Sequence, residues 1–366
     1  MVHFRKKINI NFPRLIFSSL EKAEVLIFDN ISGRDASIIL FADKKFTFLD
    51  TRRQTLNIKA FLSAVFSRGI ERLSLKYYNH CIKQVEPKIC FIMQENTRVF
   101  YDLKILNPKI IFIAVSQGGN YGDPYADQWP IFYERGEKLN TDYLVVDSEN
   151  SVDFFSKVIH AKFLRYGNSR VNANLPFIDS RKVTGVGYIS EFRSGSLNYN
   201  KAHSKLIGLI SKYTQLNGLD FKVGLSSSRP DKTFSYLEEL NFFKLHAGAF
   251  NSSPLPSIVY LSGCEIVICC ISTLGLELIS LGKKVIFIDI LYKYENYRKN
   301  YFSHRYGDSG PFWCSGNSSK EILDKISYVK QLSQDEWRNI LSKYEMPIQY
   351  FDPENRNFKN FLNRLI

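Results

Sequence analysis

The chain has 366 residues, of which 45% are hydrophobic and 23% are charged. A chain of this length and ordinary composition buries a large core without disulfides or metals, which excludes disordered, collagen-like and mini-protein scaffolds. Lys and Arg number 49 against 36 Asp and Glu, a formal net charge of +13. Such a surface attracts nucleic acid, acidic lipid or phosphorylated substrates, unless the charge only reflects a Lys-rich overall composition.

The cysteines and histidines show no metal-binding pattern. The six cysteines form no CxxC pair, and the six histidines include no HExxH motif. We therefore expect no metal site and a reduced, cytoplasmic protein. The basic N-terminal residues precede no apolar signal segment, and no apolar stretch reaches the roughly 18 residues of a transmembrane helix. We expect neither feature.

The first half of the chain alternates short apolar runs with amphipathic stretches. A helix is predicted at 56–69. Strands are predicted at 23–29, 36–42, 45–50, 88–94, 109–116 and 142–148. Their Val, Ile and Phe residues are continuous rather than alternating, which is typical of strands buried on both faces of a parallel sheet. The fold class predicted is therefore α/β.

A polar stretch at 168–184, which contains Pro176, is the predicted domain linker, and the same pattern restarts after it. Helices are expected at 199–216 and 274–282, and strands at 183–192, 219–227, 265–272 and 283–289. We predict two Rossmann-like domains, 1–175 and 176–345, facing a cleft. Residues 346–366 are expected to form a C-terminal helix that could pack back on the first domain. In such folds, ligands bind at the carboxyl ends of strands and in the cleft.

The segment 265–289 is the most informative for function. Its predicted strand ends at Ser272 and Thr273, and Leu274 and Gly275 open the following helix. The free N–H groups of a helix start can hold an anion, although Ser272 or Thr273 could simply cap the helix. Glu277 lies one turn further on, where it could accept sugar or ribose hydroxyls or merely sit at the rim of the cleft.

Three further segments follow predicted strands. Glu95 stands where a general base is useful, although a solvated turn acid would look the same. The glycine-rich segment 115–122 suits close approach to a ligand, or a tight turn. Arg52 precedes a helix and suits phosphate or carboxylate, or is a solvated helix start. No nucleic-acid-binding signature stands out, and we expect no such partner.

Taken in order along the chain, seven segments resemble bacterial surface carbohydrate biosynthesis proteins of capsule, lipopolysaccharide and O-antigen pathways, which look like GT-B glycosyltransferases. The resemblance spans roughly residues 20–340. The matching segments are 46–57, 86–104, 113–122, 142–174, 186–193, 265–289 and 310–319. The chain departs from the family at Glu95, where Asp is usual, at Gly118, where Asn or His is usual, and at Arg52-Arg53-Gln54, where Arg-Gly-Glu is frequent.

The resemblance implies an inverting, metal-independent glycosyltransferase that needs no cofactor. Its donor would be a nucleotide sugar, with a CMP-linked Kdo or sialic-type sugar as one option, and its acceptor a glycan or lipid-linked glycan at the inner membrane face. Glu95 would be the catalytic base. The acceptor side would contain Arg52, Asn96, Gln117, Gly118, Gly119 and Asn120. The donor side would contain Ser190, Glu191, Arg193, Ser272, Thr273, Leu274, Gly275 and Glu277.

Two alternatives remain open at this point. A nucleotide-sugar epimerase would use the same two-domain cleft. A non-catalytic glycan- or lipid-binding scaffold of the same pathway would account for the missing side chain at Gly118.

Overall fold

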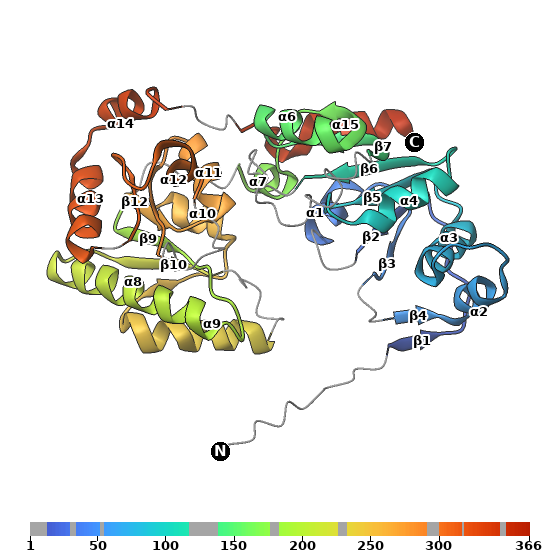
Figure 1. Ribbon diagram of the computed structural model, residues 1–366, viewed down its shortest axis with the longest axis horizontal. Coiled ribbons are helices and arrows are strands. Elements are labelled where there is room, and N and C mark those ends of the chain that lie inside the picture. Colours follow the sequence, from blue (N-terminus) through green and yellow to red (C-terminus); the bar gives the residue numbers. More distant parts are fainter. Residues whose placement is uncertain are drawn as a thin grey trace, which may run out of the picture.

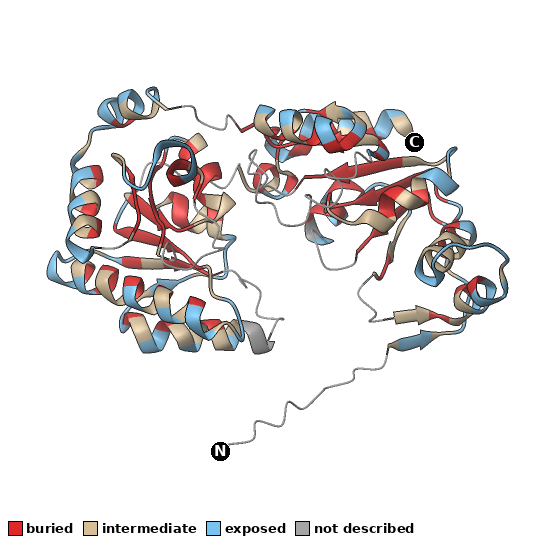
Figure 2. Ribbon diagram, viewed as in Figure 1, coloured by how far each residue is buried: buried red, intermediate tan, exposed pale blue. Residues whose placement is uncertain are grey.

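The computed structural model describes residues 13–29, 34–51, 55–116, 138–175, 183–225, 233–290, 300–316, 318–344 and 349–366. These residues form two lobes, each built around one six-stranded sheet (Figure 1). Buried residues concentrate on the strands and on the inner sides of the helices in both lobes (Figure 2).

The N-terminal lobe contains a sheet in the order β3-β2-β5-β6-β7-β8, and every neighbouring pair is parallel. Its strands are β2 (Val25–Phe28), β3 (Phe46–Leu49), β5 (Ile89–Ile92), β6 (Ile111–Val115), β7 (Leu139–Val145) and β8 (Ile159–Leu164). β2 and β5 are buried along their whole length, as expected for strands covered on both faces. The prediction of parallel α/β sheets is confirmed.

Helices cover both faces of this sheet, and a two-stranded parallel pair lies beside it. The helices are α1 (Arg34–Leu40), α2 (Ile58–Phe66), α3 (Leu73–Val85), α4 (Arg98–Leu106) and α6 (Glu149–Val158). The pair consists of β1 (Arg14–Ile16) and β4 (Thr55–Asn57). α2 begins after Asn57, whose side chain accepts a hydrogen bond from the Ala60 amide at 2.9 Å.

One predicted strand of this lobe is wrong. The run 36–42 is helical over Arg34–Leu40. Ala36 and Leu40 are buried, whereas Ile38 and Ile39 are exposed, which is the pattern of a helix covering a core. A short continuous apolar run does not distinguish a buried strand from such a helix, and this ambiguity caused the error.

The C-terminal lobe contains a second all-parallel sheet, in the order β11-β10-β9-β12-β13-β14. Its strands are β9 (Val186–Ile189), β10 (Phe221–Gly224), β11 (Asn251–Ser252), β12 (Ile266–Cys269), β13 (Lys284–Ile288) and β14 (Trp313–Cys314). Its helices are α8 (Leu197–Leu216), α9 (Thr233–Ala247), α10 (Ser257–Ser262), α11 (Thr273–Ser280), α12 (Tyr301–Tyr306), α13 (Ser319–Gln331) and α14 (Gln334–Leu341).

The last helix, α15 (Arg356–Leu365), lies against the N-terminal lobe (Figure 1). Its residues Phe358 and Leu362 are buried in one core with Val25, Ile27 and Phe91 of the N-terminal sheet. The chain therefore passes between the lobes twice. Phe358 is held at the start of the helix because its amide donates to Asp352 at 2.9 Å.

The two passages between the lobes are joined by hydrogen bonds. The first includes the short helix α7 (Ser169–Asn174), which occupies part of the predicted polar linker because Asn168 caps it by accepting from the Arg170 amide. The second includes the 3-10 turn Pro353–Asn355. Asn172 accepts a hydrogen bond from the Asp352 amide at 2.9 Å. Side-chain amides are favoured here because they can donate and accept between two irregular segments.

Within the part of the chain that the structure describes, no helix has the length and apolar composition needed to span a bilayer.

Candidate functional site

Each sheet has one place where the order of its strands reverses. It lies between β2 and β5 in the N-terminal lobe and between β9 and β12 in the C-terminal lobe. The connections leaving these neighbouring strands run to opposite faces of the sheet, so a crevice opens at the carboxyl ends, where open α/β sheets bind ligands. Glu95 follows β5 and Ser272 follows β12. Both predicted centres therefore lie at switch points.

Glu95 lies in the turn between β5 and α4 and is only 5% exposed. The turn is fixed partly by Tyr101, whose hydroxyl donates to the Glu95 carbonyl oxygen at 2.5 Å. This burial excludes the alternative of a solvated turn acid. Asn96, in the same turn, is half-buried. The roles of the Glu95 carboxylate as base and of Asn96 in acceptor contact stay predictions.

Three more buried acids lie along the carboxyl edge of the N-terminal sheet. Asp29 follows β2, Asp50 follows β3 and Asp147 follows β7, and none is more than 8% exposed. Asp29 also has a backbone φ of 70°, which is uncommon for a residue other than glycine. These residues were not singled out from the sequence. The available signal was that an Asp closes each of the three apolar runs.

Ser272 caps α11, because its hydroxyl oxygen accepts from the Leu274 amide at 3.3 Å. Ser272 therefore caps the helix, which is one of the two roles that the sequence left open. The amides just before the helix hold a carboxylate of the protein itself: Glu191 Oε1 accepts from Cys270, Ile271 and Ser272 at 3.0, 2.8 and 2.9 Å. These amides are therefore occupied by a side chain of the protein itself. Phosphate contact by Ser272, Thr273 or Leu274 stays a prediction.

Gly275 is required by packing. A Cβ at this position would collide with the Cys269 sulfur and would lie 3.0 Å from the Phe287 ring. The glycine therefore lets α11 approach β12 and β13 closely. Contact between the Gly275 backbone and a donor stays a prediction.

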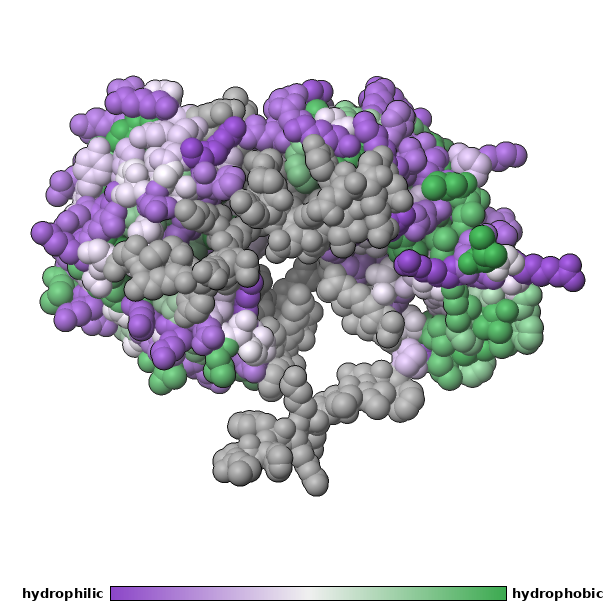
Figure 3. All heavy atoms as spheres, viewed as in Figure 1, coloured by the Kyte–Doolittle hydropathy of each residue, from purple (hydrophilic) through white to green (hydrophobic). Residues whose placement is uncertain are grey.

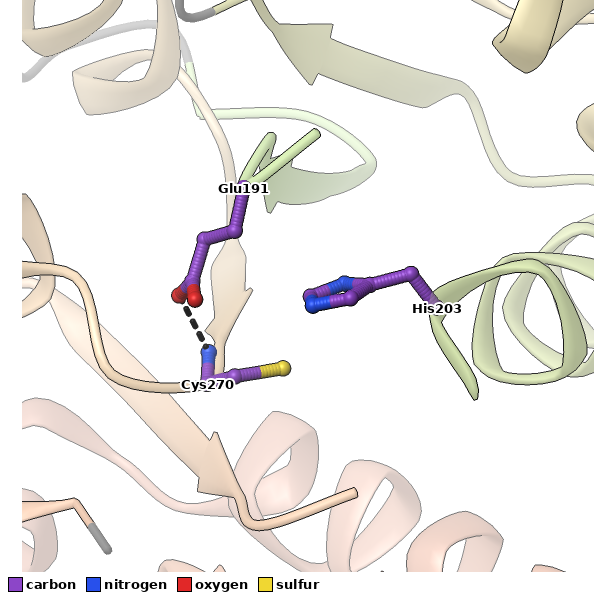
Figure 4. A group of neighbouring side chains, drawn as sticks. All are labelled: Glu191, His203 and Cys270. Carbon is purple, nitrogen blue, oxygen red and sulfur yellow. Dashed lines mark hydrogen bonds between the residues drawn. The ribbon is translucent and has the colours of Figure 1, made fainter. Parts of the chain in front are cut away.

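Glu191, which is half-buried, lies beside the buried residues His203 and Cys270, and the three side chains converge in Figure 4. Their donor atoms all lie within 4.8 Å of one another, and carboxylate, imidazole and thiolate are ligands that Zn²⁺ accepts. Glu191 Oε2, however, also accepts from the Tyr199 hydroxyl at 2.9 Å, so the carboxylate already receives four hydrogen bonds. We therefore interpret the group as a hydrogen-bonded network, and the expectation of no metal stays a prediction.

Burial sets the protonation of this network. Desolvation lowers the pKa of His203 to about 3, so its imidazole is neutral, and Nδ1 lies 2.6 Å from the Tyr188 hydroxyl. Desolvation also raises the pKa of Glu191, although the hydrogen bonds from the amides and from Tyr199 oppose that rise. The network joins the end of β9 to the end of β12 and to α8 across the switch point.

The neighbours of Glu191 differ in exposure. Ser190 is buried and its hydroxyl donates to Glu239 of α9. Arg193 is exposed, with its guanidinium 4.3 Å from the centre of the Tyr199 ring. Donor contact by Ser190, Glu191 and Arg193 stays a prediction, and the structure adds that the first two also hold the lobe together.

Glu277 lies where the two lobes meet. Its Oε1 accepts from the side-chain amide of Asn168 at 2.7 Å, and the residue is 5% exposed, so it is not a rim residue. Burial raises the pKa of Glu277 to about 8. Asp147 raises this pKa further, whereas Asn168 and Arg170 oppose the rise. The carboxyl group is therefore largely neutral near pH 7.

These contacts relate the two carboxyl edges. Asn168 follows β8 and Glu277 lies in α11 after β12, so their hydrogen bond brings the carboxyl ends of the two sheets near each other. A second contact joins the lobes where Asn150 donates to the Tyr301 hydroxyl at 3.4 Å. Arg52, Gln117, Gly118, Gly119 and Asn120, all predicted on the acceptor side, lie outside the described residues.

Solved structures of similar fold span nearly the whole chain. MnaA of S. aureus, in a co-structure with UDP, has a TM-score of 0.55 at 11% identity, covering 95% of this chain and 98% of that chain. UDP-GlcNAc 2-epimerase of Methanocaldococcus jannaschii, in complex with UDP-GlcNAc and UDP, has a TM-score of 0.52 at 10% identity, covering 93% and 99%. The spinosyn rhamnosyltransferase SpnG has a TM-score of 0.51 at 12% identity, covering 93% and 100%. No curated protein sequence matches the chain.

The fold and the facing carboxyl edges define a GT-B-like protein with two Rossmann-like domains facing a cleft, which confirms the predicted fold class. Residues 196–366 match a family described as "putative O-antigen biosynthesis protein". The resemblance to surface carbohydrate biosynthesis proteins is thereby confirmed.

Proposed function

We propose that the protein is an inverting, metal-independent glycosyltransferase of surface polysaccharide biosynthesis. One observation carries the proposal: the switch points of both sheets open toward the contact between the lobes, one with Glu95 and the other with Ser272 and Glu277. This division suits a transferase, because donor and acceptor can be bound on two facing surfaces and held close to one another. The O-antigen family match supports the pathway.

In the proposed reaction, the C-terminal lobe binds a nucleotide sugar and the N-terminal lobe binds the acceptor. Glu95 takes the proton of the acceptor hydroxyl, whose oxygen attacks the anomeric carbon of the donor sugar. The bond from that carbon to the phosphate oxygen breaks on the opposite face, so the configuration inverts. Ser272 and Thr273, with their neighbouring amides, would stabilise the departing phosphate, and the neutral Glu277 carboxyl would hydrogen-bond a sugar or ribose hydroxyl.

The donor nucleotide is the least constrained part of the proposal. A CMP-linked Kdo or sialic-type sugar follows from the sequence resemblance, whereas solved structures of the same fold are described with UDP or UDP-GlcNAc. A thermal-shift panel with CMP, UDP, GDP and CDP distinguishes them. Selective stabilisation by CMP supports the acidic-sugar donor, and selective stabilisation by UDP overturns that part of the proposal.

Glu95→Gln tests the base, with Asp29→Asn as the matched control on the neighbouring strand. We expect Glu95→Gln to lower transfer by about 10²- to 10⁴-fold while calorimetric affinity for the donor nucleotide is kept. Transfer to a glycan acceptor is measured by mass spectrometry of the product. Normal turnover by Glu95→Gln together with loss of transfer in Asp29→Asn would show that Asp29, at the end of the adjacent strand, is the base instead.

A nucleotide-sugar epimerase is the second candidate, because a UDP-GlcNAc 2-epimerase shares this fold over most of the chain. Incubation of the donor without acceptor separates the two. Formation of the epimer supports this candidate, and a donor that reacts only with acceptor supports transfer. A protein that binds donor or glycan but turns over neither would be a scaffold.

The proposed setting is the cytoplasm, at the inner face of the membrane, since the acceptor of such a pathway would be a glycan carried on a lipid. The proposed reaction uses no cofactor and no nucleic acid. Association with the membrane surface is part of the proposal, and it requires a surface suited to lipid.

A further inference from the structure

The outer side of α2 has a reversed polarity. A surface helix ordinarily turns its apolar residues inward and its polar residues to water. In α2 the buried residues are Ala60 and Ala64, whereas Leu62, Val65 and Phe66 are 48%, 47% and 81% exposed. These three positions are spaced i, i+3 and i+4, so they form one apolar stripe directed away from the protein.

The stripe continues into the connection to α3. Ile70 is 103% exposed and Leu73 is 46% exposed. We name Leu62, Val65, Phe66, Ile70 and Leu73 the α2 flank. In the space-filling view, hydrophobic residues gather on the outer side of the N-terminal lobe, over α2 and α3 (Figure 3). A contiguous exposed apolar surface of this kind marks an interaction site rather than ordinary surface.

The charges beside the α2 flank are mostly basic. Lys59, Arg68 and Arg72 are exposed, and Glu71 is the one acid between residues 55 and 76. Within the described residues, neither Arg68 nor Arg72 forms an ion pair with an acid. Their charges are therefore available to an external anion.

The combination suits a lipid surface. Helices that lie on membranes combine Phe and Leu on the apolar side with Lys and Arg along the flank. The side chain of Lys76 donates to the carbonyls of Ser67 and Gly69 at 3.1 and 2.7 Å, and these bonds hold the connection after α2 in place. The apolar side chains are thus carried on a formed helix and a braced turn.

We propose that the α2 flank is a docking surface for an anionic lipid bilayer, with the apolar side chains inserted among the headgroups and Lys59, Arg68 and Arg72 facing the lipid phosphates. The inference extends the proposed function, because a lipid-linked acceptor would be presented at this surface on the acceptor-side lobe. Vesicle binding needs neither donor nor acceptor, so its failure is distinguishable from failure of the proposed reaction.

The test is flotation of the full chain with vesicles of phosphatidylcholine alone and of phosphatidylcholine with phosphatidylglycerol. We expect binding to the anionic vesicles, reduced by at least about a hundredfold in Leu62→Ser/Val65→Ser/Phe66→Ser. Arg68→Gln/Arg72→Gln should lose about fivefold for each charge removed. Circular dichroism of each variant checks the fold, and Phe66→Ser alone replaces the triple variant if that variant unfolds.

Matched controls come from exposed positions of the C-terminal lobe. Leu197, Leu216 and Leu245 are 85%, 77% and 77% exposed, so Leu197→Ser/Leu216→Ser/Leu245→Ser removes equivalent apolar surface elsewhere. Lys201→Gln/Lys212→Gln removes two exposed charges of α8. Both controls should bind anionic vesicles like the original chain. Unchanged binding by the α2 variants would overturn the proposal. A dimer in light scattering that the α2 variants abolish, without vesicle binding, would overturn it in favour of a second copy.

Discussion

The protonation of Glu277 should make the stability of the protein depend on pH. Its carboxyl group is buried between the lobes, and the pKa is raised from 4.5 to about 8. The folded protein therefore retains a proton between these two pH values, whereas the unfolded chain has lost it. The contribution of Glu277 to the free energy of unfolding should accordingly be greatest below about pH 4.5 and should fall as pH rises toward about 8. The full difference amounts to about 5 kcal/mol.

Local opening limits this magnitude. If the Asn168–Glu277 contact separates at alkaline pH, the carboxylate reaches water without unfolding of either lobe, and the loss stops at the free energy of opening. We therefore expect the free energy of unfolding to decrease by about 1 to 5 kcal/mol, which is more than an exposed glutamate would cause.

Glu277→Gln provides the comparison. The substituted amide oxygen can still accept from Asn168 but cannot ionise, so the stability of this variant should not fall over this pH range. His203 titrates in both proteins, and subtraction of the two curves removes its contribution. Urea unfolding followed by circular dichroism from pH 5 to pH 9 measures the difference. Parallel curves for the original protein and the Glu277→Gln variant would refute the assignment of a neutral, buried carboxyl.

Three further predictions concern the C-terminal switch point. Glu191→Ala should lower the free energy of unfolding by at least about 3 kcal/mol, because three amides lose their acceptor. Tyr199→Phe removes one hydrogen bond and should lower it by about 1 kcal/mol. Equal losses in urea unfolding would contradict this prediction. Gly275→Ala should lower the free energy of unfolding by about 1–3 kcal/mol, because the added Cβ collides with Cys269. Gly208→Ala in α8 should leave stability unchanged or raise it slightly. The reverse order in thermal unfolding would disprove the packing role of Gly275. Because the pKa of His203 is lowered to about 3, the free energy of unfolding should fall as pH drops from about 6.5 toward 3. His203→Gln should reduce this fall in the curve of stability against pH. An unchanged curve would show that other groups cause the fall.

The sequence predicted most of the strands because burial on both faces leaves continuous apolar runs. β2, β5, β6, β12 and β13 all lie inside predicted runs. The same criterion failed at 36–42, where the helix α1 covers the sheet with Ala36 and Leu40. Run length and composition are alike in the two cases, and the distinction is made by tertiary packing that a single sequence does not show.

The organisation of the site was less accessible from the sequence. A sequence indicates which residues close a strand, but not which strands are neighbours, so it placed Glu95 and Ser272 at carboxyl ends without locating them at switch points. The three amides that hold Glu191 are 79 to 81 residues away along the chain. Asn168 and Glu277 are separated by 109 residues. Such partners are set by strand order and by the contact between lobes, neither of which follows from local patterns.

The two switch points differ in their charged groups. The N-terminal edge has several buried acids, among them Glu95, the residue proposed as the base. Across the contact, Glu277 is held neutral by burial, so its carboxyl group does not repel an anionic donor, and the amides near Ser272 are already occupied by Glu191. In the proposed reaction, a donor on the C-terminal side would therefore meet a neutral carboxyl, and its phosphates would need groups other than the amides that hold Glu191. The proposed inversion requires these phosphates to lie away from the incoming hydroxyl, and binding of donor and acceptor on separate lobes would allow that arrangement.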